Sequence, residues 1–231
     1  MTSPSPEPAL RAHERALRAI AATPALWVPR KAAMRALRLT WATPWPVVAK
    51  RHDLPRLLNR RRLLGCGVEV GVRTGEFSEH LLAAWRGRHL ISVDPWAEAP
   101  VEDYVNLDNV PQEAHDRLYE ETVARLSCFG DRSSIWRMTG AEAARRIPRY
   151  CLDFVYLDAR HDYASVREDL DQWFPAVRPG GILAGHDYVD GRFAEGEFGV
   201  RSAVDEFCAA RSLRVRATFT DAPWNSWFVV V

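Results

Sequence analysis

Acidic and histidine side chains follow two apolar segments of this 231-residue chain, at the point where each segment ends. Asp158 ends the first segment and His161 comes three positions later, whereas the adjacent His186 and Asp187 end the second. In an open α/β sheet, ligands bind beyond the carboxyl ends of the strands, so these four side chains are expected to converge. Carboxylate and imidazole groups can hold a divalent cation, and an imidazole can also take a proton near neutral pH. The sequence therefore predicts metal-assisted acid–base chemistry at this point.

Each of these residues also has an ordinary structural interpretation. Asp158 could cap the helix that follows it, because an aspartate at a helix start accepts backbone N–H groups. Asp187 could stabilise a turn, His161 could be a surface histidine and His186 a hydrogen-bonded structural one. The spacing is compatible with both interpretations.

A glycine-containing loop within Val68–Ser78 is the second feature with chemical potential. Gly71 and Gly75 can adopt φ angles that other residues resist, and the helix that follows offers unpaired N–H groups. Asp94 comes nineteen residues after Gly75, where an acid can accept both ribose hydroxyls of a nucleoside. The loop lacks the G-x-G-x-x-G spacing and the chain lacks Gly-Lys-Ser/Thr, which disfavours dinucleotides and P-loop nucleotides. The pattern indicates another nucleoside cofactor, although such a turn can also be only a turn.

The pattern Glu69-x-Gly71-x-x-x-Gly75 resembles the first motif of the class I S-adenosylmethionine (SAM) methyltransferases. In that family the loop surrounds the methionine end of the cofactor, and the later acid holds the ribose. The resemblance further implies that the residues after the third strand line the adenine and that Trp96 packs on the same ring. The predicted cofactor is therefore SAM, bound by Glu69, Gly71, Gly75, Asp94, Trp96, Gly140, Ala141 and Asp158.

The polar residues after the two apolar segments resemble those of the metal-dependent O-methyltransferases, which include the catechol and macrolide-sugar O-methyltransferases. By this resemblance His161 is the general base, acting beside Asp158, and Asp158, His186 and Asp187 hold a divalent metal, Mg²⁺ or Mn²⁺. The sugar enzymes are the closer match, because they place a histidine at the base position where the catechol enzyme has a lysine. His186 is a departure, since those families usually have an acid there and histidine suits Mn, Fe, Ni or Zn better than Mg.

The loops at residues 96–110 and 186–198 are expected to form the walls of the acceptor site. The candidate acceptor-binding residues in or beside them are Tyr104, Tyr163, Tyr188 and Arg192. The predicted function is SAM-dependent, metal-assisted methyl transfer to a hydroxyl of a sugar, a glycoside or a similar small molecule. Two alternatives remain: an RNA or protein methyltransferase that uses a basic N-terminal arm, and a non-catalytic SAM-fold partner protein. The first lacks support from an Asn/Asp-Pro-Pro-Tyr motif after the fourth strand.

The elements that must position these residues alternate between apolar segments and amphipathic helices, as is typical of an α/β domain with a parallel sheet. Strands are predicted at residues 66–72, 89–93, 134–138, 152–157, 181–184, 215–220 and 227–231, and helices at 76–85, 112–126, 141–147, 163–174 and 200–210. Only residues 221–226 join the last two strands, too few for a parallel crossover, so these strands form an antiparallel hairpin. This order resembles the Rossmann-like class I methyltransferase fold, a three-layer sandwich around a seven-stranded sheet.

Charge divides the chain into two parts. Residues 1–62 contain 13 Lys and Arg against 3 Asp and Glu, whereas residues 63–231 contain 18 against 27. A basic helical arm at 1–62 is therefore predicted before a methyltransferase domain at 63–231. The arm could contact nucleic acid, a membrane surface, or the acidic body of its own or a partner subunit. Its interleaved Trp and Pro residues favour packing, as a homo-oligomer contact or a lid over the site, and nucleic acid is not the expected partner.

Cysteine usage and hydropathy indicate the compartment. The four cysteines include no C-x-x-C pair, which is typical of reduced thiols in a cytosolic protein. The chain has no apolar run of 18 residues, and its first residues lack the basic and apolar regions of a signal peptide. An Arg-rich, acid-poor arm is also compatible with an organellar transit peptide. We expect a soluble, cytoplasmic protein without a membrane partner.

Overall fold

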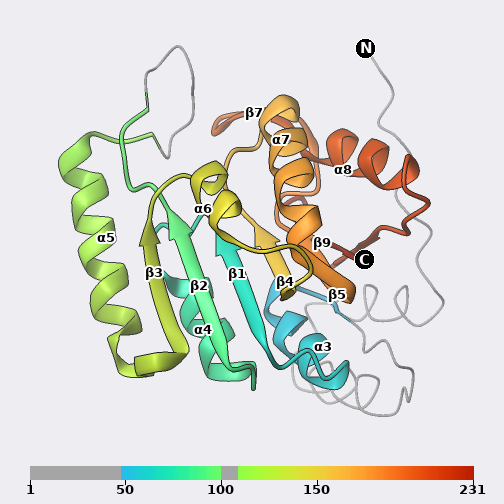
Figure 1. Ribbon diagram of the computed structural model, residues 1–231. Helices are drawn as coiled ribbons and strands as arrows, with labels where there is room; N and C mark the ends of the chain where they lie inside the picture. Colours follow the sequence, from blue (N-terminus) through green and yellow to red (C-terminus); the bar gives the residue numbers. More distant parts are fainter. Residues whose placement is uncertain (1–47, 100–108) are drawn as a thin grey trace, which may run out of the picture.

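The computed structural model describes residues 48–99 and 109–231, and its sheet has the predicted architecture (Figure 1). The seven strands lie in the order β3-β2-β1-β4-β5-β9-β8. The first five pair in parallel, whereas β9 pairs antiparallel with both β5 and β8, so the predicted terminal hairpin is confirmed. The strand bounds are β1 Cys66–Val70, β2 His89–Asp94, β3 Ser133–Arg137, β4 Leu152–Leu157, β5 Val177–Gly185, β8 Arg216–Ala217 and β9 Trp227–Val230.

Two groups of helices cover the sheet, one on each face (Figure 1). α3, α4 and α5 pack on one face, and α6, α7 and α8 pack on the other. The helix bounds are α3 Leu54–Arg60, α4 Glu76–Ala84, α5 Gln112–Leu126, α6 Gly140–Arg146, α7 Tyr163–Trp173 and α8 Val200–Ala209, with short 3₁₀ turns η2 Arg51–Asp53, η3 Ser127–Arg132 and η4 Phe174–Ala176. Within the described ranges, no helix combines the length and apolarity needed to cross a membrane.

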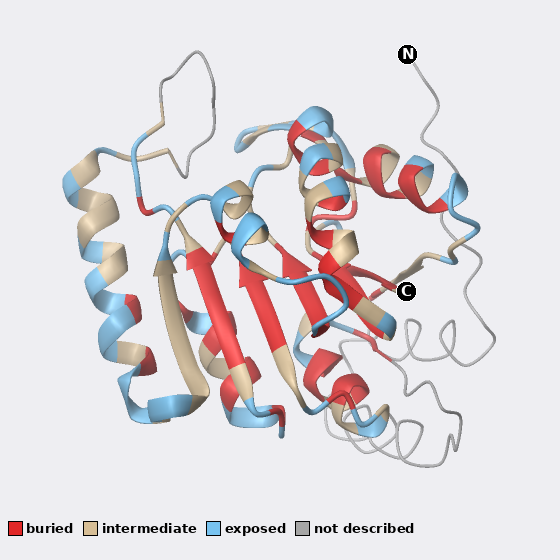
Figure 2. Cartoon of the chain, in the orientation of Figure 1, coloured by how far each residue is buried: buried red, intermediate tan, exposed pale blue. Residues whose placement is uncertain are grey.

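The central strand β4 contributes to two hydrophobic cores, because successive side chains of a strand point to opposite faces. Val155 and Leu157 join the core under α6, α7 and α8, whereas Phe154 and Tyr156 join the core under α3, α4 and α5. The central strands are buried along most of their length (Figure 2). Burial on both faces fixes the register of β4, and therefore the position of Asp158 directly beyond its end.

The segment at residues 48–62, which the charge pattern assigns to the arm, packs on the second of these cores. The carbonyl oxygen of Ala49 accepts backbone hydrogen bonds from Phe219 and Thr220, both at 3.0 Å. Three leucines of α3 are fully buried in that core: Leu54, Leu57 and Leu58. This segment is therefore part of the packed domain.

Residues 186–198, predicted as a loop, contain a small second sheet. The strands β6 (Asp190–Phe193) and β7 (Gly196–Gly199) form an antiparallel ribbon. The loop prediction was wrong because this segment is polar and glycine-rich and lacks the alternation of a half-buried strand. The ribbon packs through Phe198 on Trp224, with ring centroids 5.2 Å apart, a contact that sequence periodicity does not reveal.

Candidate functional site

A cleft of about 560 Å³ lies at the carboxyl ends of β1, β2 and β4, where the sequence places its ligand-binding residues. Its volume falls in the range of small-molecule and cofactor sites, which is roughly 300–1,000 Å³. Most of the predicted cofactor residues line it: Glu69, Gly71, Asp94, Trp96, Gly140, Ala141 and Asp158.

Gly71 allows the loop after β1 to lie against the segment after β4. Its φ is +86°, and a Cβ added there would lie 2.0 Å from the backbone oxygen of Asp158. Gly75 has a φ of +78° and is the N-cap residue of α4. Both glycines therefore meet a backbone requirement, since residues with a Cβ rarely adopt such φ values.

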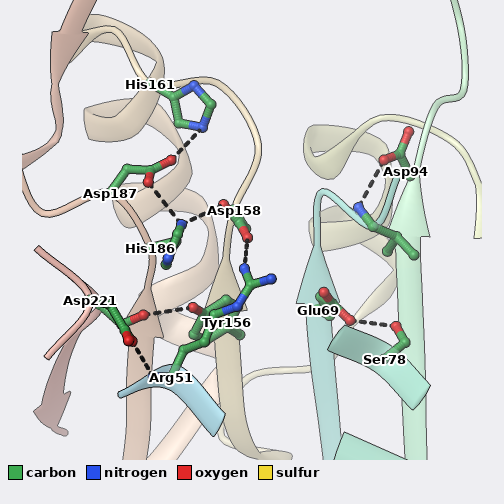
Figure 3. A network of polar contacts seen from close by, with 12 residues as sticks. Arg51, Glu69, Ser78, Asp94, Tyr156, Asp158, His161, His186, Asp187 and Asp221 are labelled. Atoms are coloured by element: carbon green, nitrogen blue, oxygen red, sulfur yellow. Dashed lines mark hydrogen bonds and ion pairs between the residues drawn. The ribbon is translucent and has the colours of Figure 1, made fainter. Parts of the chain in front are cut away.

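Glu69 is buried at the inner end of the cleft and accepts a hydrogen bond from the hydroxyl of Ser78 (Figure 3). Burial raises the pKa of Glu69 to about 8, although the Ser78 hydrogen bond opposes this rise. A carboxyl with this pKa is mostly protonated at neutral pH, and a cationic ligand group beside it would favour its ionised form.

Asp94 holds the glycine loop through its carboxylate. Its Oδ2 atom accepts hydrogen bonds from the backbone N–H of Val72 at 2.8 Å and of Arg73 at 3.0 Å (Figure 3). Its Oδ1 atom accepts one from the backbone N–H of Trp96 at 2.8 Å. Trp96 is itself buried, and its indole N–H donates to the carbonyl of Arg73 at 2.8 Å. The ends of β1 and β2 are thereby locked together on the floor of the cleft.

The four polar residues predicted to converge do so (Figure 3). Nε2 of His161 lies 3.1 Å from Oδ2 of Asp187, and Nδ1 of His186 lies 2.8 Å from Oδ1 of Asp187. The same Nδ1 atom is 3.7 Å from Oδ1 of Asp158. Asp187 therefore bridges two imidazoles and lies next to a second carboxylate.

Burial and hydrogen bonding shift the protonation of this cluster. Burial works against the ionised form of Asp187, but hydrogen bonds from His161 and His186 outweigh it and hold the pKa of Asp187 well below its usual range. Burial likewise works against the charged form of His186, but Asp187 and Asp158 outweigh it and raise the pKa of that imidazole. Burial also raises the pKa of Asp158, which His186 opposes.

The geometry is compatible with a bound cation. One ligand atom from each of Asp158, His161 and Asp187 can be chosen so that all lie within 4.8 Å of one another, a spacing that a single divalent ion can bridge. His186, also predicted as a metal ligand, is outside this group of three, and its Nδ1 lies 2.8 Å from Oδ1 of Asp187 and 3.7 Å from Oδ1 of Asp158. Mixed carboxylate and imidazole donors suit Mn, Fe, Ni or Zn better than Mg.

The contacts bear on the purely structural roles that the sequence also allows for Asp158 and Asp187. The helix after β4 is capped by Asp162, whose side chain accepts a hydrogen bond from the backbone N–H of Ser165 at 2.9 Å. Asp158 does not fill that role. Asp187 has a φ of +53°, an uncommon conformation for a residue other than glycine, and such backbone strain concentrates at functional sites.

The predicted acceptor-binding residues lie elsewhere. Tyr163 is exposed on α7 and donates a hydrogen bond to Glu206 at 2.6 Å, and Tyr188 is buried with its hydroxyl on Asp205. Arg192 is exposed on β6. None of these three lines the cleft, and Tyr104 lies outside the described residues.

Arg51 and Asp169 also line the cleft, although neither was predicted as a site residue. Arg51 places its guanidinium 3.2 Å from Oδ2 of Asp158 and 4.9 Å from the Phe77 ring centroid. Asp169 of α7 faces the cleft beside Gly140. No sequence signal marks Arg51, since it is one of 13 basic residues in its segment, but Asp169 is an acid at a helical position among apolar ones.

Comparison with protein families identifies the class of this chain. The model of a family described as a methyltransferase domain matches residues 68–188, which run from within β1 to beyond the end of β5 and include all four residues of the polar cluster. The chain therefore belongs to this methyltransferase-domain family. Its strand order and terminal hairpin are those expected of a class I SAM-dependent methyltransferase, so the recognition from the glycine motif is confirmed.

Solved structures agree on the fold. An O-methyltransferase from Bacillus cereus in complex with SAH has a TM-score of 0.55 and 12% identity, covering 96% of this chain and 92% of that one. A protein provisionally described as an rRNA methylase from Clostridium thermocellum has a TM-score of 0.56 and 13% identity. The match covers 80% of this chain and 96% of that one. At these identities the likeness shows the fold alone.

Among curated sequences, the uncharacterized protein y4gI of Sinorhizobium fredii is 24% identical over 134 residues, or 58% of this chain. The match spans 14% of the length of that protein.

Proposed function

We propose that this chain is a SAM-dependent O-methyltransferase that activates its acceptor hydroxyl with Asp158, His161 and Asp187. One observation carries the proposal: donor atoms of these three residues lie within 4.8 Å of one another, and all three line the cleft that also contains the glycine loop. The acceptor is a small hydroxylated molecule. A sugar or glycoside is favoured by the resemblance of His161 to the base of the sugar O-methyltransferases.

The proposed chemistry divides between cofactors and side chains. Bound SAM would supply an electrophilic methyl group, and a divalent metal held by Asp158 and Asp187 would supply positive charge to stabilise the deprotonated hydroxyl. Because the carboxylate of Asp187 only accepts hydrogen bonds, the ring nitrogen of His161 that faces it carries the hydrogen, which leaves the lone pair of neutral His161 on Nδ1. That atom is the proposed proton acceptor. Stacking of the imidazole on Phe198, at 4.7 Å between centroids, fixes its orientation.

Binding measurements test the site without a known acceptor. Calorimetry with SAH and with Mn²⁺ should show both ligands binding to the wild-type chain. Asp187→Asn should lose Mn²⁺ affinity at least about tenfold, because a charged ligand becomes neutral, and should keep SAH affinity. Asp190→Asn, on the exposed β6–β7 ribbon, is the matched control and should change neither. Failure of the wild-type chain to bind SAH would exclude the proposed function.

Two histidine variants separate the base from a metal ligand. With a panel of small glycosides and SAH release as the readout, His161→Gln should slow turnover about 10²–10⁴-fold and keep Mn²⁺ binding. His186→Gln should weaken Mn²⁺ binding through the loss of its hydrogen bond to Asp187. If only His161→Gln lost the metal, His161 would be a ligand and the proposed base assignment would be wrong.

The arm and the assembly belong to the same proposal. Arg51 of the basic segment lines the cleft, which supports a role for that segment beside the site. We also propose a cytoplasmic homo-oligomer. Sedimentation equilibrium of the full chain tests the assembly, and a monomer at micromolar concentration would contradict it.

A further inference from the structure

The end of the sheet opposite the cleft has a concentration of arginines. The segments that lead into the five parallel strands all lie at this end, which we call the amino edge (Figure 1): residues 59–65, 85–88, 127–132, 147–151 and 174–176. They contain seven arginines and one acid, Asp131. The segments that follow the same strands contain two arginines and four acids: residues 71–75, 95–99, 138–139, 158–162 and 186–189. Positive charge therefore gathers at the end of the strands away from the cleft.

Hydrogen bonds join the first three segments of the amino edge into one surface. The side chain of Asn59 accepts a hydrogen bond from the backbone N–H of Arg86 at 2.8 Å. The backbone N–H of Arg88 donates to the carbonyl of Leu64 at 2.9 Å. The guanidinium of Arg132 donates to two carbonyls of the 85–88 segment, at 2.8 and 3.3 Å. The arginines of these segments are therefore neighbours in space, although they are far apart in the sequence.

Four exposed arginines of the amino edge have no acidic partner within residues 48–99 and 109–231. The guanidinium groups of Arg60, Arg62 and Arg86 make no hydrogen bond or ion pair there. That of Arg88 is 3.4 Å from Sγ of Cys66 and makes no ion pair with the same part of the chain. A guanidinium presents a planar fork of N–H donors that fits the oxygens of a phosphate group. These side chains can therefore receive phosphates without first breaking an ion pair.

Exposed apolar side chains lie at the same edge. Leu64 is 39% exposed, and Tyr150 is 56% exposed with the guanidinium carbon of Arg149 5.4 Å from its ring centroid. A nucleic acid could use the arginines and stack a base on Tyr150, but Leu64 would gain nothing from it. A phospholipid surface uses all three kinds of side chain, because its headgroups contain phosphate and its interface accepts Leu and Tyr. The combination favours a lipid surface.

We propose that the amino edge docks on an anionic phospholipid surface, with Arg60, Arg62, Arg86 and Arg88 on the headgroup phosphates and Leu64 at the acyl boundary. Because the cleft lies at the opposite end of the strands, the docked chain presents it to the aqueous phase. None of these five residues lines the cleft, so the inference is independent of the proposed function. The expectation of no membrane partner came from the lack of a long apolar run, which does not bear on a surface assembled from separate segments.

Co-sedimentation with vesicles tests the proposal. The full chain should bind phosphatidylglycerol vesicles and should not bind phosphatidylcholine vesicles. Arg60→Gln/Arg62→Gln should weaken phosphatidylglycerol binding at least about tenfold, because each basic residue near an anionic surface adds to the attraction. Leu64→Ser should weaken it about threefold and keep its salt dependence. Arg117→Gln/Arg192→Gln is the matched control, since it removes equal charge from exposed positions on α5 and β6, and it should bind within about twofold of wild type.

Three outcomes would overturn the proposal. The first is failure of the wild-type chain to bind phosphatidylglycerol vesicles. The second is an equal loss of binding in the arginine variant and its control, because general charge and not the amino edge would then carry the attraction. The third is unchanged vesicle binding by Leu64→Ser together with poly(U) RNA binding that Arg60→Gln/Arg62→Gln abolishes, which would assign the surface to nucleic acid. SAH affinity should be the same in all these variants, so the proposed function is tested separately.

Discussion

Nη1 of Arg51 lies 3.2 Å from Oδ2 of Asp158, so a cation from the N-terminal segment contacts a carboxylate of the polar cluster (Figure 3). Both side chains are mostly buried, with 26% and 18% of their surfaces exposed. The backbone of Arg51 is also held in place, because its N–H donates a hydrogen bond to Oδ2 of Asp221 at 3.1 Å. Under the proposed function, Arg51 and a divalent metal would compete for the same carboxylate.

Arg51→Ala should therefore bind Mn²⁺ more tightly. Removing a nearby positive charge from Asp158 should strengthen Mn²⁺ binding about fivefold, which corresponds to about 1 kcal/mol for a partly exposed pair. Arg192→Ala, which removes an equal charge from the exposed ribbon, should have no effect. Calorimetric titration of Mn²⁺ into wild type, Arg51→Ala and Arg192→Ala measures the three affinities. Unchanged or weaker Mn²⁺ binding by Arg51→Ala would refute the competition.

Gly71 and Gly180 offer a matched pair of substitutions. Both have positive φ, +86° and +79°, but a Cβ at Gly71 would overlap the backbone of Asp158, whereas nothing lies within 4 Å of one at Gly180. Gly180→Ala should cost about 1–2 kcal/mol of unfolding free energy, the price of a left-handed conformation. Gly71→Ala should cost about 1–3 kcal/mol more and weaken SAH binding, because the cleft floor must move. Urea unfolding and SAH calorimetry measure both effects, and equal losses in the two variants would contradict the steric argument.

Much of this fold could be predicted because its strands bury both faces. The apolar segments of β1, β2 and β4 are long enough to recognise, and the short connection before β9 permits only an antiparallel pair. The order of the strands then places Asp158 and Asp187 at adjacent carboxyl ends, without knowledge of any side-chain contact.

What could not be predicted depends on contacts between distant segments. The β6–β7 ribbon rests on Trp224, and Arg51 reaches Asp158 across 107 positions of the chain. Residue type alone predicts the acceptor-binding residues, but the hydroxyl of Tyr188 donates to Asp205 of α8 and Tyr188 does not line the cleft. Periodicity reports which face of an element is buried, and it does not report what that face meets.

Truncation should separate the two parts of the basic segment. Removal of residues 1–60 deletes Leu54, Leu57 and Leu58 and should prevent folding or lower the unfolding free energy by several kcal/mol, since each buried leucine contributes roughly 2–5 kcal/mol. Removal of residues 1–47 leaves these side chains in place and should preserve the thermal transition. Only the shorter truncation is therefore a fair test of RNA binding by the arm. Loss of a cooperative transition in the shorter variant would contradict this division.

The buried carboxyl of Glu69 should make stability depend on pH. Burial raises its pKa to about 8 from an ordinary value near 4.5, so between these values the folded chain holds a proton that the unfolded chain has released. The free energy of unfolding should then fall as pH rises from about 4.5 to 8, because the unfolded state binds fewer protons. Glu69→Gln keeps an acceptor for Ser78 but cannot titrate, so its stability should lack this component. Urea unfolding of both proteins at pH 5.5, 7 and 8.5 isolates the effect, since all other groups titrate in both. The stability of wild type relative to Glu69→Gln should decrease steadily over this range, and a constant difference would show that Glu69 is ionised throughout.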